Sequence, residues 1–146
     1  MASYYGVNNT KQYVNIPSEK IPAGEQYGRI HIAYDEYTTA ATGGASTIET
    51  ADTIAVMKLP AGARIIDATM VHEDFGGSGV LELGITGDVD YLLAAVAVNA
   101  AGAAQMDGEA GNLVKLSAET QCYVTCTNNT ATVSKKFQVT VSYVID

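Results

Sequence analysis

The sequence predicts an all-β fold: an antiparallel, jelly-roll-like β-sandwich that follows an extended N-terminal arm. Apolar residues recur at every second position in several short segments, which is the period of a half-buried strand. Gly, Pro and Asn residues that favour turns separate these segments. No long segment has the 3.6-residue apolar period of an amphipathic helix. Seven or eight short strands with such turns are typical of a sandwich or barrel. We therefore expect an arm over residues 1–26 and a sandwich domain over 27–146.

The predicted arm contains two of the three prolines, Pro17 and Pro22. Each proline removes a backbone donor, which excludes a helix interior or a central strand there. The alternative is a flexible tail, since chain ends are commonly loose, but aromatic residues are rare in disordered tails. We expect the arm to dock onto a neighbouring chain, with Val7 assisting the contacts of the principal anchors. These anchors are Tyr4, Tyr5, Tyr13, Val14 and Ile16.

The first half of the domain contains three predicted strands, over residues 29–35, 52–59 and 64–73. In the first, alternation places one set of apolar side chains on a common face: Ile30, Ile32 and Tyr34. In the third, the common face carries Ile66, Ala68 and Met70. The segment 38–50 is rich in Thr, Ala and Gly and is expected to be a loop, with a short edge strand as the alternative.

The second half contains further predicted strands, over residues 80–85, 113–116, 121–127 and 136–145. The segment 90–98 is ambiguous, because its alanines favour helix at the start and its valines favour strand at the end. We therefore allow at most one short helix, near 90–95, and we expect a small-residue loop over 100–111. The predicted core consists of Ile30, Ile32, Ile54, Ile66, Leu81, Leu83, Val124, Phe137, Val139 and Val141.

Charge is sparse and negative: charged residues make up 16 % of the chain, and the formal net charge is −8. Nucleic-acid binding depends on Lys and Arg that neutralise phosphates, and only Lys135 and Lys136 are adjacent here. Nucleic acid and anionic membranes are therefore not expected partners. The N-terminus has no apolar core of a signal peptide, and no apolar run approaches the roughly 20 residues of a spanning helix.

Cysteine and histidine provide no recognisable chemical site. If Cys122 and Cys126 lie on one strand, they face the same side about 13 Å apart, which is too far for a disulfide. We expect both to be small buried hydrophobic residues. A zinc site would need further ligands, and only His31 and His72 are available. Both histidines fall within predicted strands and are expected on a sheet surface or an interface.

The acidic and glycine-rich turns also lack a complete motif. Asp88 and Asp90 have the alternate spacing of calcium loops, but such a loop needs about six oxygen ligands and the following alternate positions supply none. No phosphate-binding glycine loop opens a helix, and there is no nucleophile elbow. We therefore predict no catalytic residues, no metal, no cofactor and no enzymatic activity.

The order of segments from about residue 20 onward resembles small virion proteins of tailed bacteriophages that are encoded near the major capsid protein. The strongest piece is the turn and strand start Lys58-Leu59-Pro60-Ala61-Gly62-Ala63-Arg64. Gly28-Arg29-Ile30-His31-Ile32-Ala33-Tyr34-Asp35-Glu36-Tyr37 and the C-terminal Val141-Ser142-Tyr143-Val144-Ile145-Asp146 add to it. The resemblance covers about four fifths of the chain, and several such proteins are capsid decoration, or cement, proteins.

The resemblance implies a structural protein that is made in the host cytoplasm and binds the outer surface of the virion capsid. There it would bridge subunits of the major capsid protein, commonly as a homotrimer. Two other classes stay open: a host-surface or carbohydrate-binding module of a fibre, and a neck or tail component that assembles as a ring. The absence of tryptophan disfavours sugar binding, because Trp is the strongest aromatic platform.

Overall fold

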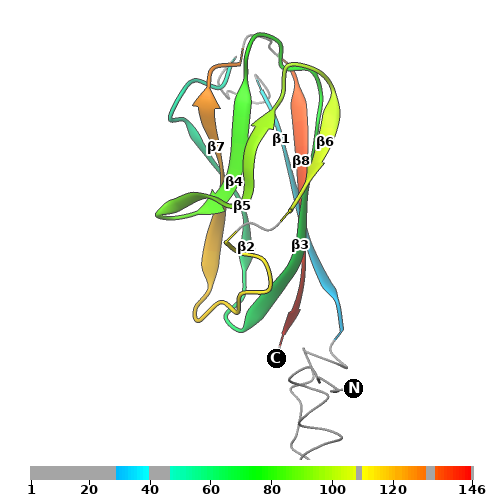
Figure 1. Ribbon diagram of the computed structural model, residues 1–146, viewed down its shortest axis with the longest axis vertical. Coiled ribbons are helices and arrows are strands. Elements are labelled where there is room, and N and C mark those ends of the chain that lie inside the picture. The colour runs from blue at the N-terminus through cyan, green and yellow to red at the C-terminus, as the bar shows by residue number, and fades with distance from the viewer. Residues whose placement is uncertain (1–28, 40–46, 108–109, 131–133, 146) are drawn as a thin grey trace, which may run out of the picture.

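The computed structural model describes residues 29–39, 47–107, 110–130 and 134–145, which form eight strands (Figure 1). The described residues contain no helix, and so none that could span a membrane. The arm, 1–26, and its anchors lie outside the described residues. The strands are β1 (His31–Thr38), β2 (Thr53–Leu59), β3 (Ala63–His72), β4 (Val80–Ile85), β5 (Asp88–Ala97), β6 (Gly102–Gln105), β7 (Thr120–Asn128) and β8 (Lys136–Ile145).

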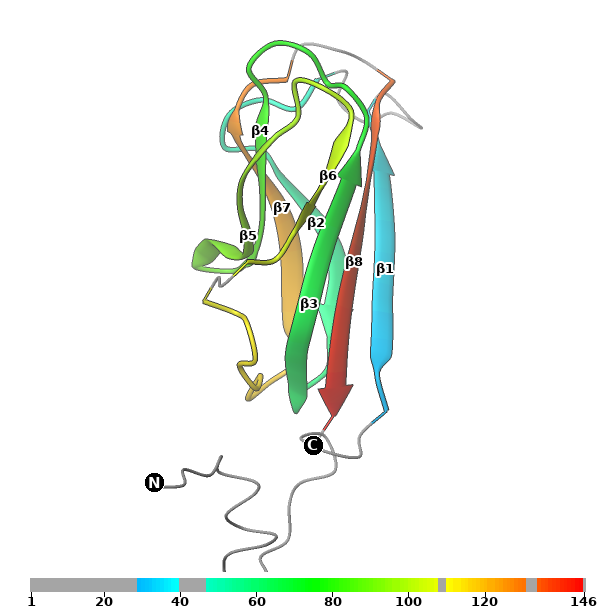
Figure 2. The same ribbon diagram turned by 45° about the vertical axis from the view of Figure 1, so that its right-hand side comes forward.

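The strands form two four-stranded antiparallel sheets, in the orders β1-β8-β3-β6 and β2-β7-β4-β5. Figure 2 shows the two sheets face to face. The pairing is nested: β1 pairs with β8, β2 with β7, β3 with β6, and β4 with β5. A long hairpin that is rolled over itself gives this order, which is that of a jelly roll. The predicted antiparallel β-sandwich is therefore confirmed.

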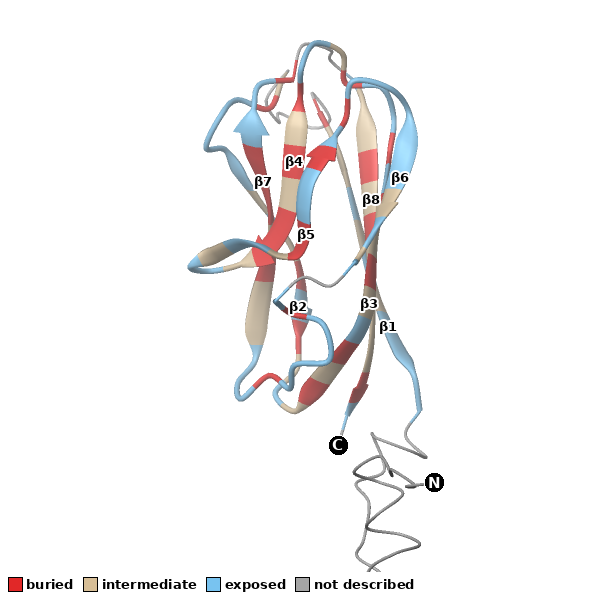
Figure 3. Cartoon of the chain, viewed as in Figure 1, coloured by how far each residue is buried: buried red, intermediate tan, exposed pale blue. Residues whose placement is uncertain are grey.

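The core lies between the sheets, and Figure 3 shows buried residues recurring along β3 and β8. On β8, every second residue from Phe137 through Val139 to Val141 is fully buried. Six of the ten predicted core residues are buried: Leu81, Leu83, Val124, Phe137, Val139 and Val141. Ile54 is partly buried and packs against this core. Ile48 and Phe75, which belong to the core, were not predicted.

The prediction for the faces of β1 is wrong. Ile30 and Ile32 are 66 % and 67 % exposed, and Tyr34 faces outward with them at 55 %. The register with β8 explains the inversion, because opposed residues in an antiparallel pair lie on the same face. Ala33 lies opposite the buried Val141, and Tyr37 lies opposite the buried Phe137. The rings of Tyr37 and Phe137 are 5.7 Å apart between centroids.

Ile66 is also outside the core, with 38 % of its surface exposed. The register between β3 and β8 shifts between Ile65 and Asp67, so Ile66 is the extra residue of a β-bulge. A bulge breaks strict alternation, and the buried position therefore passes to Ile65, which is fully enclosed. The predicted neighbours Ala68 and Met70 are buried.

The ambiguous segment is strand β5, not a helix. Its pairing with β4 is irregular, with register shifts between Leu81 and Leu83 and again between Leu83 and Ile85. Ala95 has a φ of 45°, which marks the left-handed conformation common in bulges. These irregularities bend β5 and explain why its sequence has no clean period of two.

Two other element predictions need correction. The predicted loop 100–111 contains β6, which pairs with Thr69–His72 of β3. The pairing partner, rather than the propensity of Gly-Ala-Ala-Gln, determines this short edge strand. The predicted strand 113–116 is instead an irregular segment that makes one isolated bridge, between Arg64 and Lys115.

Candidate interaction surface

The described residues contain no group of three or more His, Cys, Asp or Glu side chains that could hold a metal ion. Cys122 and Cys126 are unpaired thiols, fully buried on β7, as the sequence predicts. Burial raises the pKa of Cys122 to about 11 and raises the pKa of Cys126 as well. Because the thiolate is the reactive form of cysteine, burial acts against the reactivity of both sulfurs.

The two histidines lie at opposite ends of the β1-β8-β3-β6 sheet. His31 lies opposite Tyr143 and stacks on its ring, with 5.5 Å between centroids. His72 lies opposite Phe137 and is buried, with Nδ1 3.2 Å from the carbonyl oxygen of Glu73. The structure therefore does not bring the histidines together, and each makes an ordinary packing contact.

The predicted acidic pair does come together. A side-chain hydrogen bond with Asp90 raises the pKa of Asp88, and burial and the Asp90 charge act in the same direction. Such a shift means that the two carboxyl groups compete for a proton. Two carboxylates are well short of the oxygen ligands that calcium requires, and the described residues add no third acidic ligand.

The sheets end in four edge strands, β1, β6, β2 and β5. An edge strand presents unpaired backbone groups, and proteins commonly blunt such edges with bulges or short length. β6 has only four residues, and β5 is irregular against β4 at two places. β1 is different, because all eight of its residues pair with β8 without a register shift. It is the longest regular edge in the described part of the chain.

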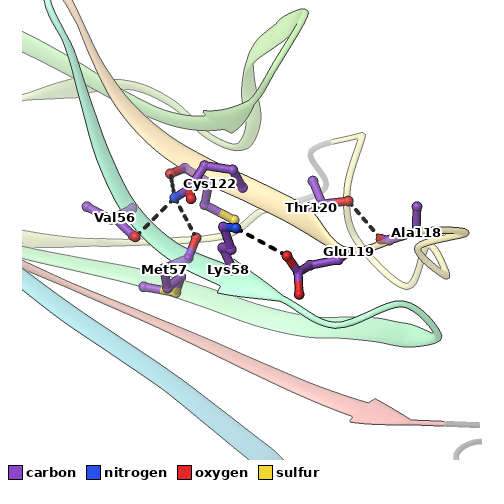
Figure 4. A network of polar contacts seen from close by, with 8 residues as sticks. Val56, Met57, Lys58, Ala118, Glu119, Thr120 and Cys122 are labelled. Carbon is purple, nitrogen blue, oxygen red and sulfur yellow. Dashed lines mark hydrogen bonds and ion pairs between the residues drawn. The ribbon is translucent and has the colours of Figure 1, made fainter.

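The edge at β2 is blunted by a bulge, and Figure 4 shows the polar contacts of its residues Val56 and Met57. Its register with β7 shifts between Ala55 and Lys58. The side-chain amide of Gln121 donates to the carbonyl oxygens of Val56 and Met57, at 3.0 and 3.1 Å. These bonds satisfy acceptors that the bulge removes from the ladder.

Ile32 and Tyr34 of the regular β1 edge are exposed, as is Ile30 just before the strand, and we call these three residues the β1 apolar row. The row is bordered by a polar network. Tyr34 Oη donates to Glu36 Oε2 at 2.7 Å, and Gln138 Nε2 donates to Tyr34 Oη at 2.8 Å and to Glu36 Oε2 at 3.0 Å. The hydrogen bond from Gln138, followed by that from Tyr34, lowers the pKa of Glu36. An exposed apolar strip with a polar border is typical of a contact surface.

Elsewhere the outward face of this sheet is mostly polar, although Val71 of β3 is 47 % exposed on it. Thr140 of β8 lies opposite Thr69 of β3, and Thr69 lies opposite Gln105 of β6. Gln105 Nε2 donates to Asp67 Oδ2 at 3.0 Å. The β1 apolar row is therefore set apart from the neighbouring strands by its hydrophobic character.

Two surface pockets lie elsewhere. One, of about 380 Å³, is lined by His72 and by alanines of the segments 94–97 and 100–104. The other, of about 310 Å³, lies beside the β4–β5 turn and is lined in part by Thr53, Tyr123 and Thr125. Neither contains the convergent charged groups that would indicate catalysis.

Sequence reasoning assigned the β1 apolar row to the core, and so missed it as a surface. The segment offers two alternating sets, and the set that faces the core combines the apolar Ala33 and Tyr37 with the polar Arg29, His31 and Asp35. The inward-facing set is the one that lies opposite the buried apolar residues of β8. Identifying it requires the register between β1 and β8, which the sequence does not show. The predicted interface residues Tyr4, Tyr5, Tyr13, Val14 and Ile16 lie outside the described residues.

No protein-family model and no curated protein matches the sequence, but solved structures match the fold. A chain of the cyanophage Pam1 capsid asymmetric unit matches with a TM-score of 0.71 and 23 % identity, over 90 % of this chain and 96 % of that one. A chain of the Ralstonia phage GP4 capsid matches with a TM-score of 0.66 and 19 % identity, over 95 % and 96 %. A chain of the acid-stable capsid of Helicobacter pylori bacteriophage KHP30 has a TM-score of 0.57 and 12 % identity, over 80 % and 87 %. The resemblance to phage virion proteins therefore holds at the level of the fold.

Proposed function

We propose that this protein is a structural, non-enzymatic component of a phage virion that decorates and stabilises the capsid by bridging its subunits. One observation carries the proposal. The fold matches a chain of a phage capsid over nine tenths or more of both chains, in two different phages. A match of this extent fits a small, separate capsid component better than a domain of a much larger subunit. The proposed partner is the major capsid protein.

Charge supports a position on the outer surface of the capsid. The chain has a net charge of −8, and packaged DNA on the inside would repel it. The low content of long charged side chains also limits the rotamer entropy that contact formation removes. We propose that the protein forms homotrimers on the capsid lattice, where each copy contacts more than one subunit.

The arm is the proposed attachment segment. Tyr4, Tyr5 and Tyr13 would supply rigid aromatic contacts, with Val14 and Ile16 beside them. An extended segment of 20 residues spans up to roughly 65–70 Å, which is enough to reach an adjacent subunit. Pro17 and Pro22 restrict the unbound segment and so reduce the entropy that docking removes.

Deletion of residues 1–20 tests this proposal. The truncated protein is expected to co-sediment with capsids less than the full chain and to protect them less against heat. Its own thermal melting, followed by circular dichroism, is expected to stay unchanged, because the core lies between the sheets. Equal binding and equal protection by the truncated protein would show that the arm is not the attachment segment.

A further inference from the structure

We infer that β1 pairs with β1 of a second copy, in an antiparallel arrangement about a two-fold axis at Ile32. The free edge of β1 lies at the margin of its sheet, with no described strand beyond it (Figure 2). The edge is regular over eight residues, and edges of this kind readily accept another strand. The pairing would join two four-stranded sheets into one sheet of eight strands.

Geometry restricts the possible registers. Opposed residues in an antiparallel pair point to the same face. With the two-fold axis normal to the sheet, the axis therefore lies between the strands, midway between one residue and the same residue of the second copy, and outward-facing residues meet outward-facing residues. Ile32 then lies opposite Ile32 of the second copy, and Ile30 lies opposite its Tyr34. The two β1 apolar rows then lie side by side on the outward face of the joined sheet, and each row shields the flank of the other.

The same register also matches charge. On the other face of β1, Arg29 lies opposite Asp35 of the second copy, and the two-fold axis repeats this pair. Opposite charges that face each other across strands stabilise the pairing. The net charge of −8 per copy acts against association, so salt that screens this long-range repulsion is expected to favour the dimer.

Neighbouring registers lose these matches. Moving the axis by one residue to Ala33 places Ile30 opposite Glu36 and Arg29 opposite Tyr37. Moving it the other way, to His31, leaves Tyr34 with no partner among the described residues and places Arg29 opposite Ala33. Only the axis at Ile32 aligns both the apolar row and the ion pairs, and this self-complementarity is what identifies a second copy of the chain as the occupant of the edge.

The contact is small, because it involves seven residues from each copy, 29–35, of which 31–35 belong to β1. Small contacts belong to the weak, transient class of interfaces. The isolated chain is therefore expected to exchange between monomer and dimer at micromolar to millimolar concentration. Copies held close together gain from a high effective concentration. The inference concerns the isolated chain and does not depend on the proposed capsid role.

Cysteine cross-linking tests the register directly. Facing residues on paired strands have Cα atoms about 4.5–5.5 Å apart, within the range that a disulfide bridges. I32C is expected to form covalent dimers under mild oxidation. The control V71C, on the same sheet face but on the inner strand β3, is expected to stay monomeric. The native Cys122 and Cys126 are fully buried, so they are not expected to cross-link. Cross-linking of I32C no faster than V71C would overturn the inference.

Charge reversal tests it in solution, by sedimentation velocity over a range of concentrations. D35R alone and R29D alone are each expected to weaken dimerisation several-fold, because each places like charges opposite each other. An equimolar mixture of the two is expected to restore it, because every facing pair is then complementary. I32K is expected to weaken dimerisation at least about tenfold by placing two lysines on the axis. A wild-type chain that stays monomeric to 1 mM, or a mixture no better than its parts, would refute the pairing.

Discussion

Replacing Gly84 with alanine is expected to destabilise the sandwich where β5 bends over β4. Leu83 pairs with Leu93, and Ile85 pairs with Asp88. The chain therefore advances by two residues on β4 but by five residues on β5 between these two pairs. The extra β5 backbone approaches Gly84 so closely that an added Cβ would lie 2.2 Å from the carbonyl oxygen of Asp88 and 2.4 Å from that of Val89. The β5 backbone would have to retreat by roughly 1 Å to reach an ordinary contact distance.

This displacement sets the expected magnitude. Overpacking a well-packed site typically costs about 1–3 kcal/mol. The atoms in conflict at Gly84 belong to backbone rather than to a flexible side chain, so we expect a loss near the upper end, about 3 kcal/mol. Urea unfolding, followed by far-ultraviolet circular dichroism, measures the loss as a fall in the free energy of unfolding.

Gly87 provides the matched control in the same hairpin. It has a φ of 89°, and an added Cβ would meet nothing within 4 Å. Gly87→Asn retains a residue that tolerates positive φ, so its expected cost is below about 1 kcal/mol. A Gly84→Ala variant that is as stable as Gly87→Asn would refute the close approach of β5.

Three further predictions concern the core and the surface. Val139→Ala should lower the free energy of unfolding by roughly 1–3 kcal/mol through lost burial and a cavity, and an unchanged urea midpoint would contradict the 0 % exposure of Val139. Gln138→Leu should raise the pKa of Glu36 in a carboxyl NMR titration, because the hydrogen bond from Gln138 is the main cause that lowers this pKa. A carboxyl group with a lowered pKa stabilises the fold at neutral pH, and the stabilisation by Glu36 is lost as the pH falls through its pKa in the folded protein. Cys122 and Cys126 should resist thiol reagents at pH 8 in the native state and react once urea unfolds the chain, because burial raises both pKa values; rapid native reaction would argue against their burial.

The architecture could be predicted because, in several strands, the local sequence alone shows which face of the strand is buried. On β8, large apolar residues at every second position, from Phe137 to Val141, alternate with Gln138 and Thr140. Only one face of such a strand can be buried. The turns between strands are equally local, as at Pro60-Ala61-Gly62, which connects β2 to β3. These features determine fold class without knowledge of pairing.

The errors occur where tertiary pairing determines the outcome. β1 has apolar residues on both faces, and the register with Val141 and Phe137 decides that Ala33 and Tyr37 face inward. At Ile66, a bulge shifts the alternation by one residue, and nothing in the local sequence marks it. β6 consists of small residues with weak strand propensity, and its pairing with β3 forms the strand.

The interaction surface could be predicted only in part. The sequence draws attention to the tyrosines of the arm, but Tyr4, Tyr5 and Tyr13 lie outside the described residues and their role stays a prediction. The β1 apolar row is visible as a pattern in the sequence. Its exposure follows from the register with β8, which turns Ala33 and Tyr37 toward the core and this row away from it. A buried and an exposed apolar row look alike until the partner strand is known.

Imaging of the virion with this protein tagged tests the central claim most directly. If the protein decorates the capsid, the tag is expected over the whole outer surface, at three-fold positions of the lattice and in a copy number comparable to that of the capsid subunits. Density confined to the neck, tail or fibres, or only a few copies per virion, would contradict the proposed function.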